Sequence, residues 1–213
     1  LYRFLGIELP QGLSELAALG TVADLAPLID ENRSLVKEGI AQLKNTQRPG
    51  MQALCESARL EPNDINSEAI SFTIAPRLNA SGRIQHAISS YHLLTSQSTQ
   101  DAERLANEIE SFNRDRQQQT KEAVSLAKTL LPQDKDLPRI LLIDSPEFAP
   151  GSSGLVASRL VDEFYRPTII MALSEGLVRA SGRSISEFHL VDGLHKCEDL
   201  FMRFGGHSMA AGF

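Results

Sequence analysis

The sequence predicts an α/β protein in three parts: a helical first part, a long connecting helix, and a small α/β domain with a mixed sheet. Apolar side chains recur at helical spacing early in the chain, and that spacing persists over residues 98–131. Short apolar runs typical of strands begin only near residue 139, in the order β-α-β-β-α. Two small bodies joined by a rod are therefore expected.

The first part is predicted as three helices. The first begins at Leu13 and is expected to stop at Gly20, because glycine commonly ends a helix. A second helical pattern follows Pro27 and ends at residues 48–50, and a short third helix is predicted over residues 51–58.

Residues 75–83 lack periodicity and are predicted as a loop rich in Gly, Ser and Asn. Arg77 and Arg83 in such a loop offer planar forks, and the backbone offers N–H groups, to a phosphate. The alternative is that both arginines pair at the surface with carboxylates of this acidic chain. The sequence leaves both interpretations open.

The long helix is predicted from a capping-box pattern at Ser98 and Asp101. At about 1.5 Å per residue, residues 98–131 would extend roughly 50 Å. Its apolar seam is interrupted by residues 113–121, which are polar on all sides, as in helices that bridge two domains through solvent.

The last part is predicted as a small α/β domain. Its expected elements are a strand at 139–144, a helix at 154–165, strands at 168–173 and 177–184, and a helix at 190–204 that ends at Gly205–Gly206.

Composition excludes several classes of protein. The chain has 213 residues, and 21 Lys+Arg against 27 Asp+Glu give a net charge of 21 − 27 = −6. A hydrophobic content of 42% is too high for a disordered chain, and no apolar run approaches the ~18 residues that span a bilayer. A histone-like coat protein would be strongly basic. A local basic groove stays compatible with the net charge.

Two cysteines, Cys55 and Cys197, cannot form a disulfide framework or a four-ligand zinc site, so a reducing cytoplasm is the expected compartment. The chain shows no signal peptide. It begins at Leu1 and ends on an apolar run at Phe213, so both ends are expected to lie inside a longer protein.

No self-sufficient catalytic motif is present: there is no dinucleotide fingerprint, P-loop or nucleophile elbow. The histidine pairs His86/His92 and His189/His195 are six residues apart, which puts the two rings on different faces of a helix. If the protein uses a metal, most of its ligands are expected outside this chain.

Asp24 is the only acid in the apolar run 18–28. Burial of such an acid is costly unless it is paired, hydrogen-bonded or bound to a cation. The alternative is that Asp24 caps the following turn.

A second polar group follows the last predicted strand. Alternation along the strand points Ser181 and Arg183 to the same side, and Ser184 follows them. Gly205–Gly206 permits close approach of the backbone, and His207 is predicted at the N-terminus of a short helix that favours an anion. The alternative is that the glycine pair ends the preceding helix.

Four segments together resemble a known family. They are Leu-Gly-Thr-Val-Ala-Asp-Leu-Ala-Pro-Leu at 19–28, Ala-Pro-Arg-Leu-Asn-Ala-Ser-Gly-Arg at 75–83, Ser-Gly-Arg-Ser at 181–184, and Gly-Gly-His-Ser-Met-Ala-Ala-Gly at 205–212. In order and spacing they resemble the bacterial RecJ family of single-stranded-DNA-specific exonucleases, in the DHH phosphoesterase superfamily. The resemblance covers nearly the whole chain. The second segment is the most specific, while the Gly-Gly-His element is shared with other DHH enzymes.

The resemblance implies an organisation. Residues 1–90 would be the C-terminal part of a DHH catalytic domain, residues 91–135 a long connector helix, and residues 136–213 a truncated DHH-associated nucleotide-binding domain. The upstream aspartates and the Asp-His-His motif of the family are absent from this chain.

The resemblance also implies an activity: metal-dependent 5′→3′ hydrolysis of single-stranded DNA in repair and recombination. A pair of Mn²⁺ or Mg²⁺ ions would activate water, and the C-terminal domain would hold the 5′ end of the strand across a cleft. Single-strand-binding protein or helicase partners are expected, and this chain alone is expected to be inactive. The alternatives are a DHH hydrolase of short oligonucleotides or cyclic dinucleotides, and a non-catalytic nucleic-acid-binding replication relative.

By the same resemblance, Asp24 would be a catalytic residue and the last metal ligand. The substrate contacts carried over are Arg77, Asn79, Arg83, Ser181, Arg183, Ser184, Gly205, Gly206 and His207. One departure is visible: the family commonly has His-Pro-Gly where this chain has Ala149-Pro-Gly, so no function is assigned to Ala149.

Overall fold

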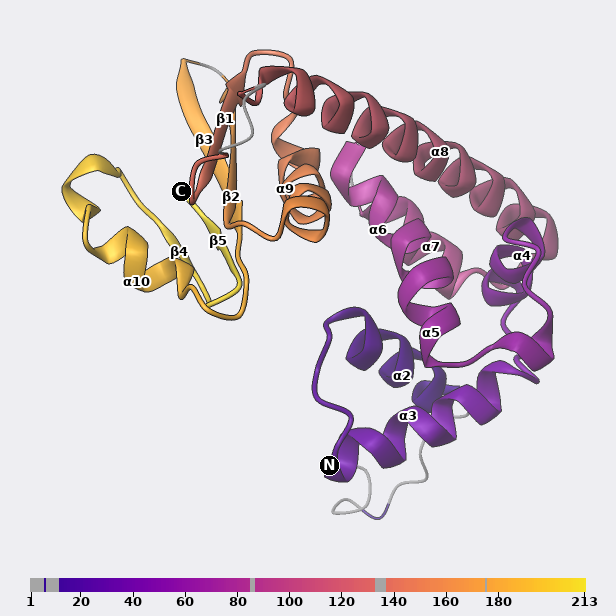
Figure 1. Cartoon of the computed structure of the whole chain (residues 1–213). Helices are drawn as coiled ribbons and strands as arrows, with labels where there is room; N and C mark the ends of the chain where they lie inside the picture. Colours follow the sequence, from indigo (N-terminus) through magenta and orange to yellow (C-terminus); the bar gives the residue numbers. More distant parts are fainter. Residues whose placement is uncertain (1–5, 7–11, 85–86, 133–136, 175) are drawn as a thin grey trace. The chain divides into compact units, whose positions relative to one another are not determined.

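The chain divides into two units, residues 1–115 and 116–213, and the boundary falls inside the long helix α8 (Thr99–Leu130; Figure 1). A computed structural model describes residues 6, 12–84, 87–132, 137–174 and 176–213. Each unit has its own hydrophobic core. No helix within those ranges is both long and apolar enough to cross a membrane.

Unit 1 is helical, as predicted. Its elements are α2 (Leu13–Ala23), α3 (Asp30–Leu43), α4 (Pro49–Ser57), η1 (Pro62–Asp64), α5 (Ser67–Ala69), η2 (Ile70–Ile74), α6 (Ala75–Ile84), α7 (Ile88–Thr95) and the first part of α8. The core collects fully buried aliphatic side chains such as Leu54, Ile70 and Ile109. The α4 and α8 predictions are confirmed to within two residues. Helix α3 is also confirmed, but it ends at Leu43 and not at residues 48–50.

The predicted end of the first helix at Gly20 is wrong, because α2 continues to Ala23. Val22, in the added turn, is 5% exposed and belongs to the core. Burial of a valine side chain contributes about 1.5–3 kcal/mol, which exceeds the roughly 0.5–1 kcal/mol cost of a glycine inside a helix. The Thr21 hydroxyl also donates to the Ala17 carbonyl at 2.7 Å.

The loop predicted over residues 75–83 is also wrong, because these residues form most of α6. The preceding η2 is a π-helical turn, in which the Ala75 N–H donates to the carbonyl of Ile70, five residues earlier. This wider pairing ends just before Pro76, where an α-helical ladder would need an N–H that proline lacks. Ala80 and Ser81 are fully buried, so packing holds the helix despite its polar sequence.

Residues 113–121 of α8, which were predicted to be solvated on all sides, are mostly exposed but not completely so. Asn113 at its start is only 1% exposed. The division between the two units falls two residues later, after Asp115.

Unit 2 is an α/β domain around a five-stranded mixed sheet of order β1-β2-β3-β5-β4. Its elements are β1 (Leu141–Ser145), α9 (Pro150–Phe164), β2 (Thr168–Ser174), β3 (Leu177–Arg183), α10 (Leu190–His195), η3 (Glu198–Leu200), β4 (Gly205–Gly206) and β5 (Ala210–Gly212). The pair β1–β2 is parallel, and the other pairs are antiparallel. The predicted mixed sheet is therefore confirmed, with two further short strands.

Helices α9 and α10 cover opposite faces of this sheet (Figure 1). Ile170 packs with Leu160 of α9, whereas its neighbour Ile169 packs with Leu190 of α10. Because side chains alternate along β2, they contribute to two separate cores on opposite faces of the sheet.

The end of the chain differs from prediction. The expected helix over 190–204 is only α10 followed by the single turn η3, and no helix begins at His207. Gly205–Gly206 instead opens a hairpin in which the His207 N–H donates to the Ala210 carbonyl at 2.8 Å. Gly206 has φ +151°, and a Cβ atom there would overlap the Ala210 carbonyl oxygen. Gly206 therefore permits the close approach of two strands rather than a helix end, whereas a Cβ atom added to Gly205 would meet nothing within 4 Å.

Candidate functional site

Asp24 is an exposed acid at the C-terminal end of α2. Its backbone N–H donates to the Gly20 carbonyl at 3.0 Å, while no hydrogen bond or ion pair within the described ranges holds its carboxylate. Asp24 does not cap the next helix either. The N-cap residue of α3 is Ile29, and no side-chain hydrogen bond caps that end of the helix. The carbonyl end of a helix carries partial negative charge, so a carboxylate is disfavoured there by about 0.3–1 kcal/mol. The turn-capping alternative therefore has no support in the geometry.

Asp24 is not part of a complete metal site. Among the described residues, no group of three or more His, Cys, Asp or Glu side chains could hold a metal ion. Mg²⁺ and similar cations need several oxygen ligands around them. The described part of this chain therefore does not by itself fit the divalent cation that the family resemblance implies.

Arg77 is largely, but not completely, buried in unit 1. Its Nε donates to Oε2 of Glu110 on α8 at 2.7 Å, and its Nη1 donates to the Thr73 carbonyl at 2.8 Å. The side chain is only 15% exposed. Pairing with a carboxylate, one of the two open interpretations, is thus observed, though inside the unit and not at its surface.

Asn79 is exposed on α6, and Arg83 lies one helical turn later, at a position whose side chain falls outside the described set. A hollow of about 270 Å³ is lined by Asn79 together with Gly20 and Ala23 of α2. The structure therefore brings Asn79 beside the last turn of α2, which Asp24 ends. Arg77 faces α8 instead.

In unit 2, the predicted common side of Ser181 and Arg183 is confirmed by the register of β3. Ser181 lies opposite Ile170 in β2 and opposite Gly212 in β5. Gly212 in turn lies opposite Gly205. A row of small residues, Ser181, Gly212 and Gly205, thus crosses the strands β3, β5 and β4.

Arg183 lies against the start of α9. Its Nη1 donates to the Gly182 carbonyl at 2.8 Å, and a Cβ atom added to Gly154 would lie 2.8 Å from its Nη2. Gly154 therefore makes room for the guanidinium group. A glycine near the first turn of a predicted helix was the available sequence signal for this contact.

Ser184 has a structural contact. The side chain is 3% exposed, and its hydroxyl donates to the Phe188 carbonyl at 2.6 Å. Its backbone N–H donates to the Met209 carbonyl at 2.9 Å. The hydroxyl is engaged in holding this turn, and a substrate contact by Ser184 stays a prediction.

A groove of about 1000 Å³ in unit 2 includes residues that the sequence did not indicate. Ser181 and Gly205 line it, together with Arg179, Arg203, Phe201 and Phe204. The two phenyl rings lie with their centroids 5.7 Å apart. In the sequence, Phe201 and Phe204 fit the seam of the helix expected over 190–204, so no separate signal marked them. Aromatic rings beside arginines suit flat, anionic ligands such as nucleotides.

Comparison with known proteins gives a consistent result. No family model matches the chain. Over 207 residues the chain is 41% identical to the single-stranded-DNA-specific exonuclease RecJ of Bacillus subtilis. The aligned segment covers 96% of this chain and 26% of that protein. Over 213 residues the chain is 38% identical to the RecJ of Thermus thermophilus, and the aligned segment covers 100% of this chain and 30% of that protein.

Solved structures agree. Crystal structures of Thermus thermophilus RecJ in complex with Mg²⁺ and with Mn²⁺ match all of this chain with a TM-score of 0.88 and 34% identity, over 33% and 31% of their own length. The chain spans 26–36% of the curated relatives that it matches. The metals are those of the solved relatives.

Proposed function

We propose that this chain, which belongs to the RecJ family as a segment about a third as long as its curated relatives, supplies part of the machinery of a single-stranded-DNA exonuclease. The longer protein would hydrolyse phosphodiester bonds from a 5′ end, in the cytoplasm, during DNA repair and recombination. Residues 1–90 would form the C-terminal part of its catalytic domain, residues 91–135 would form the connector helix, and residues 136–213 would form a nucleotide-binding domain.

The position of Asp24 carries this proposal. The side chain is exposed, makes no stabilising contact within the described ranges, and stands at the helix end that disfavours a negative charge. Hard divalent cations such as Mn²⁺ and Mg²⁺ take carboxylate oxygens as ligands. Asp24 would contribute one ligand, and the others would come from residues outside this chain.

The other candidate residues are proposed to bind the single-stranded DNA. The groups that would bind its phosphates and nucleotides are Arg77, Asn79 and Arg83 in unit 1, and Ser181, Arg183, Ser184, Gly205, Gly206 and His207 in unit 2. The groove beside Ser181 and Gly205, with its phenyl rings and arginines, supports nucleotide binding by unit 2.

Asp24→Ala in the longer protein tests the proposal. With Mn²⁺ and 5′-phosphorylated single-stranded DNA, turnover should fall at least about 100-fold, since even outer-shell partners of metal ligands cost up to that much. Glu31→Ala is the matched control, because Glu31 is an exposed acid in the first turn of α3. Normal turnover by Asp24→Ala would remove Asp24 from the metal site.

A second assay tests the claim that ligands lie elsewhere. Residues 1–213 alone, given Mn²⁺ and the same DNA, should not hydrolyse it. Robust hydrolysis by the isolated chain would contradict that claim.

A further inference from the structure

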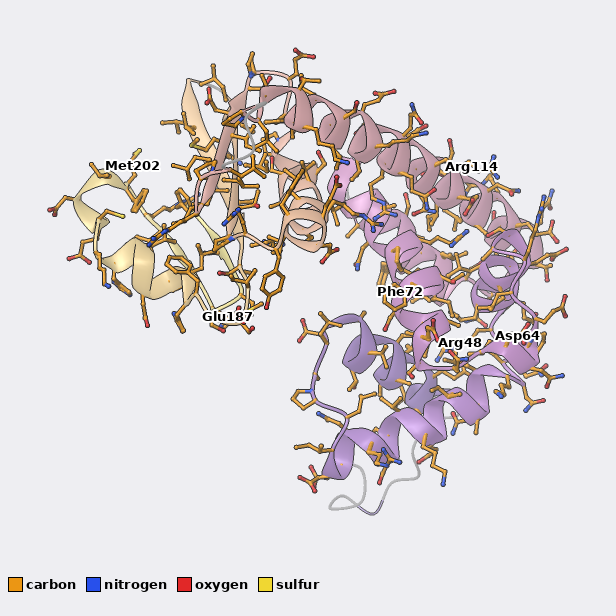
Figure 2. All side chains as sticks on the ribbon, viewed as in Figure 1. Arg48, Asp64, Phe72, Arg114, Glu187 and Met202 are labelled. Carbon is orange, nitrogen blue, oxygen red and sulfur yellow. The ribbon has the colours of Figure 1, made fainter. Side chains whose placement is uncertain are left out.

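Glu110 connects two arginines in unit 1. Its Oε2 accepts from Nε of Arg77 at 2.7 Å, and its Oε1 accepts from Nε of Arg114 at 3.2 Å. Glu110 is 12% exposed, whereas Arg114, labelled on α8 in Figure 2, is 73% exposed. The well-shielded contact is therefore the one to Arg77, and it should be the stronger of the two.

The contacts of Arg77 fix one edge of its guanidinium group. Nε is bound by Glu110 and Nη1 by the Thr73 carbonyl, one turn earlier. An arginine has five N–H donors, so these two bonds leave three. Among the described residues, no atom accepts from Nη2 of Arg77. The group is thus a fixed fork with one free edge, the geometry that binds two oxygens of a phosphate.

We propose that Glu110 is a positioning residue, which holds Arg77 in the orientation that lets its free edge bind a backbone phosphate of the strand. This inference rests on the proposed function, because it assumes a nucleic-acid strand at Arg77. Without Glu110, the arginine would have to be ordered at the moment of binding, and that ordering would weaken the complex.

Charge alone predicts the opposite result. Loss of a carboxylate near a strand removes repulsion and should tighten binding. Positioning predicts weaker binding. The sign of the change therefore separates the two effects.

The experiment compares Glu110→Gln with Glu108→Gln in the longer protein. Glu108 lies two residues earlier on α8 and accepts from the Ser89 hydroxyl at 2.9 Å, so its substitution removes the same charge without touching Arg77. For Glu110→Gln the KM for single-stranded DNA should rise about 3- to 10-fold, the size expected for ordering one side chain, with kcat little changed. Glu108→Gln should leave KM unchanged or lower it. Glu110→Asp, which keeps the carboxylate, should recover part of the loss.

A double-mutant cycle tests whether Glu110 acts through Arg77. Arg77→Lys lacks the fork, so adding Glu110→Gln to it should raise KM no further. A KM for Glu110→Gln equal to or below that of Glu108→Gln would overturn the inference, as would an undiminished effect in the Arg77→Lys background.

A substrate-free readout separates this inference from the proposed function. NMR of the arginine Nε–H groups in residues 1–213 should show a slowly exchanging Arg77 signal that Glu110→Gln abolishes and Glu108→Gln keeps. Failure of the longer protein to hydrolyse DNA, with this NMR difference intact, would sink the proposed function and its phosphate contact while leaving the fixed arginine. An identical Arg77 signal in both variants would sink the positioning role itself.

Discussion

At the scale of single residues, this acidic chain neutralises some of its arginines internally. Glu15 is 5% exposed and lies 3.2 Å from Nε of Arg48, and it also accepts from the Thr46 hydroxyl at 2.9 Å. Glu110 does the same for Arg77. The charge count therefore overstates the positive charge that these arginines offer to a distant polyanion. Their contribution to binding would be local and geometric.

Cys55 gives a prediction at the same scale. Burial raises the pKa of this thiol from its ordinary value of 9.0 to about 11. Since the folded thiol keeps its proton to higher pH than the unfolded one, its contribution to the free energy of unfolding is full below pH 9 and falls as pH approaches 11. The loss should reach about 2 kcal/mol near pH 10.5. Urea unfolding at about pH 8 and about pH 10.5 measures it.

The control for this prediction is Cys55→Ala, which should lose less stability over the same pH interval because it has no thiol to ionise. Equal losses in the two proteins would show that other groups cause the whole pH dependence. Cys197, which is only partly buried, serves as an internal comparison through Cys197→Ala.

At the scale of elements, the sequence predicted the segments whose apolar period is unbroken. The helices α3, α9 and most of α8, and the strands β2 and β3, follow from that period. The prediction from the apolar period was wrong where a glycine or proline does not end the element as local preference suggests. Gly20 lies inside a helix, Pro76 follows a π turn, and Gly205–Gly206 opens a hairpin. Each outcome depends on packing partners distant in sequence, which local preferences do not contain.

The candidate site shows the same limit. The shared side of Ser181 and Arg183 followed from strand alternation. The contact between Arg77 and Glu110 spans 33 residues, and the groove that includes Phe201 depends on the hairpin that was not predicted. Composition marked the arginines, but only the fold shows which carboxylate holds one of them.

Two glycines of neighbouring helices give a prediction at this scale. Gly20 has nothing within 4 Å of an added Cβ, so Gly20→Ala should stabilise the chain by about 0.5–1 kcal/mol through backbone entropy. Gly39 of α3 is buried, and its added Cβ would overlap the Ser14 carbonyl oxygen of α2. Gly39→Ala should therefore cost about 1–3 kcal/mol. Denaturant unfolding of both variants checks the opposite signs, and two changes of the same sign would contradict the helical setting of Gly20 or the close α2–α3 contact.

At the scale of the whole molecule, the buried apolar side chains form separate cores. Among the described residues, the unit 1 cluster draws on residues 18–109, and the unit 2 clusters draw on residues 127–211. No described residue belongs to the clusters of both units, and the boundary between the units falls inside α8. A helix that is mostly solvated at the boundary transmits little packing energy, because helical stability in proteins comes mainly from the buried face.

Local stability should therefore respond to core damage unit by unit. Leu54 in the unit 1 core and Ile170 in a unit 2 core are both 0% exposed. Replacing either by alanine should cost about 2–5 kcal/mol, the usual range for deleting a buried aliphatic side chain. Leu54→Ala should lower hydrogen-exchange protection in α2, α3 and α4 while β1 and β2 keep theirs, and Ile170→Ala should do the reverse. Because amides exchange through the cheapest opening that exposes them, an equal loss of protection in both units after either substitution would mean that the chain opens as one cooperative body, with α8 coupling the two cores.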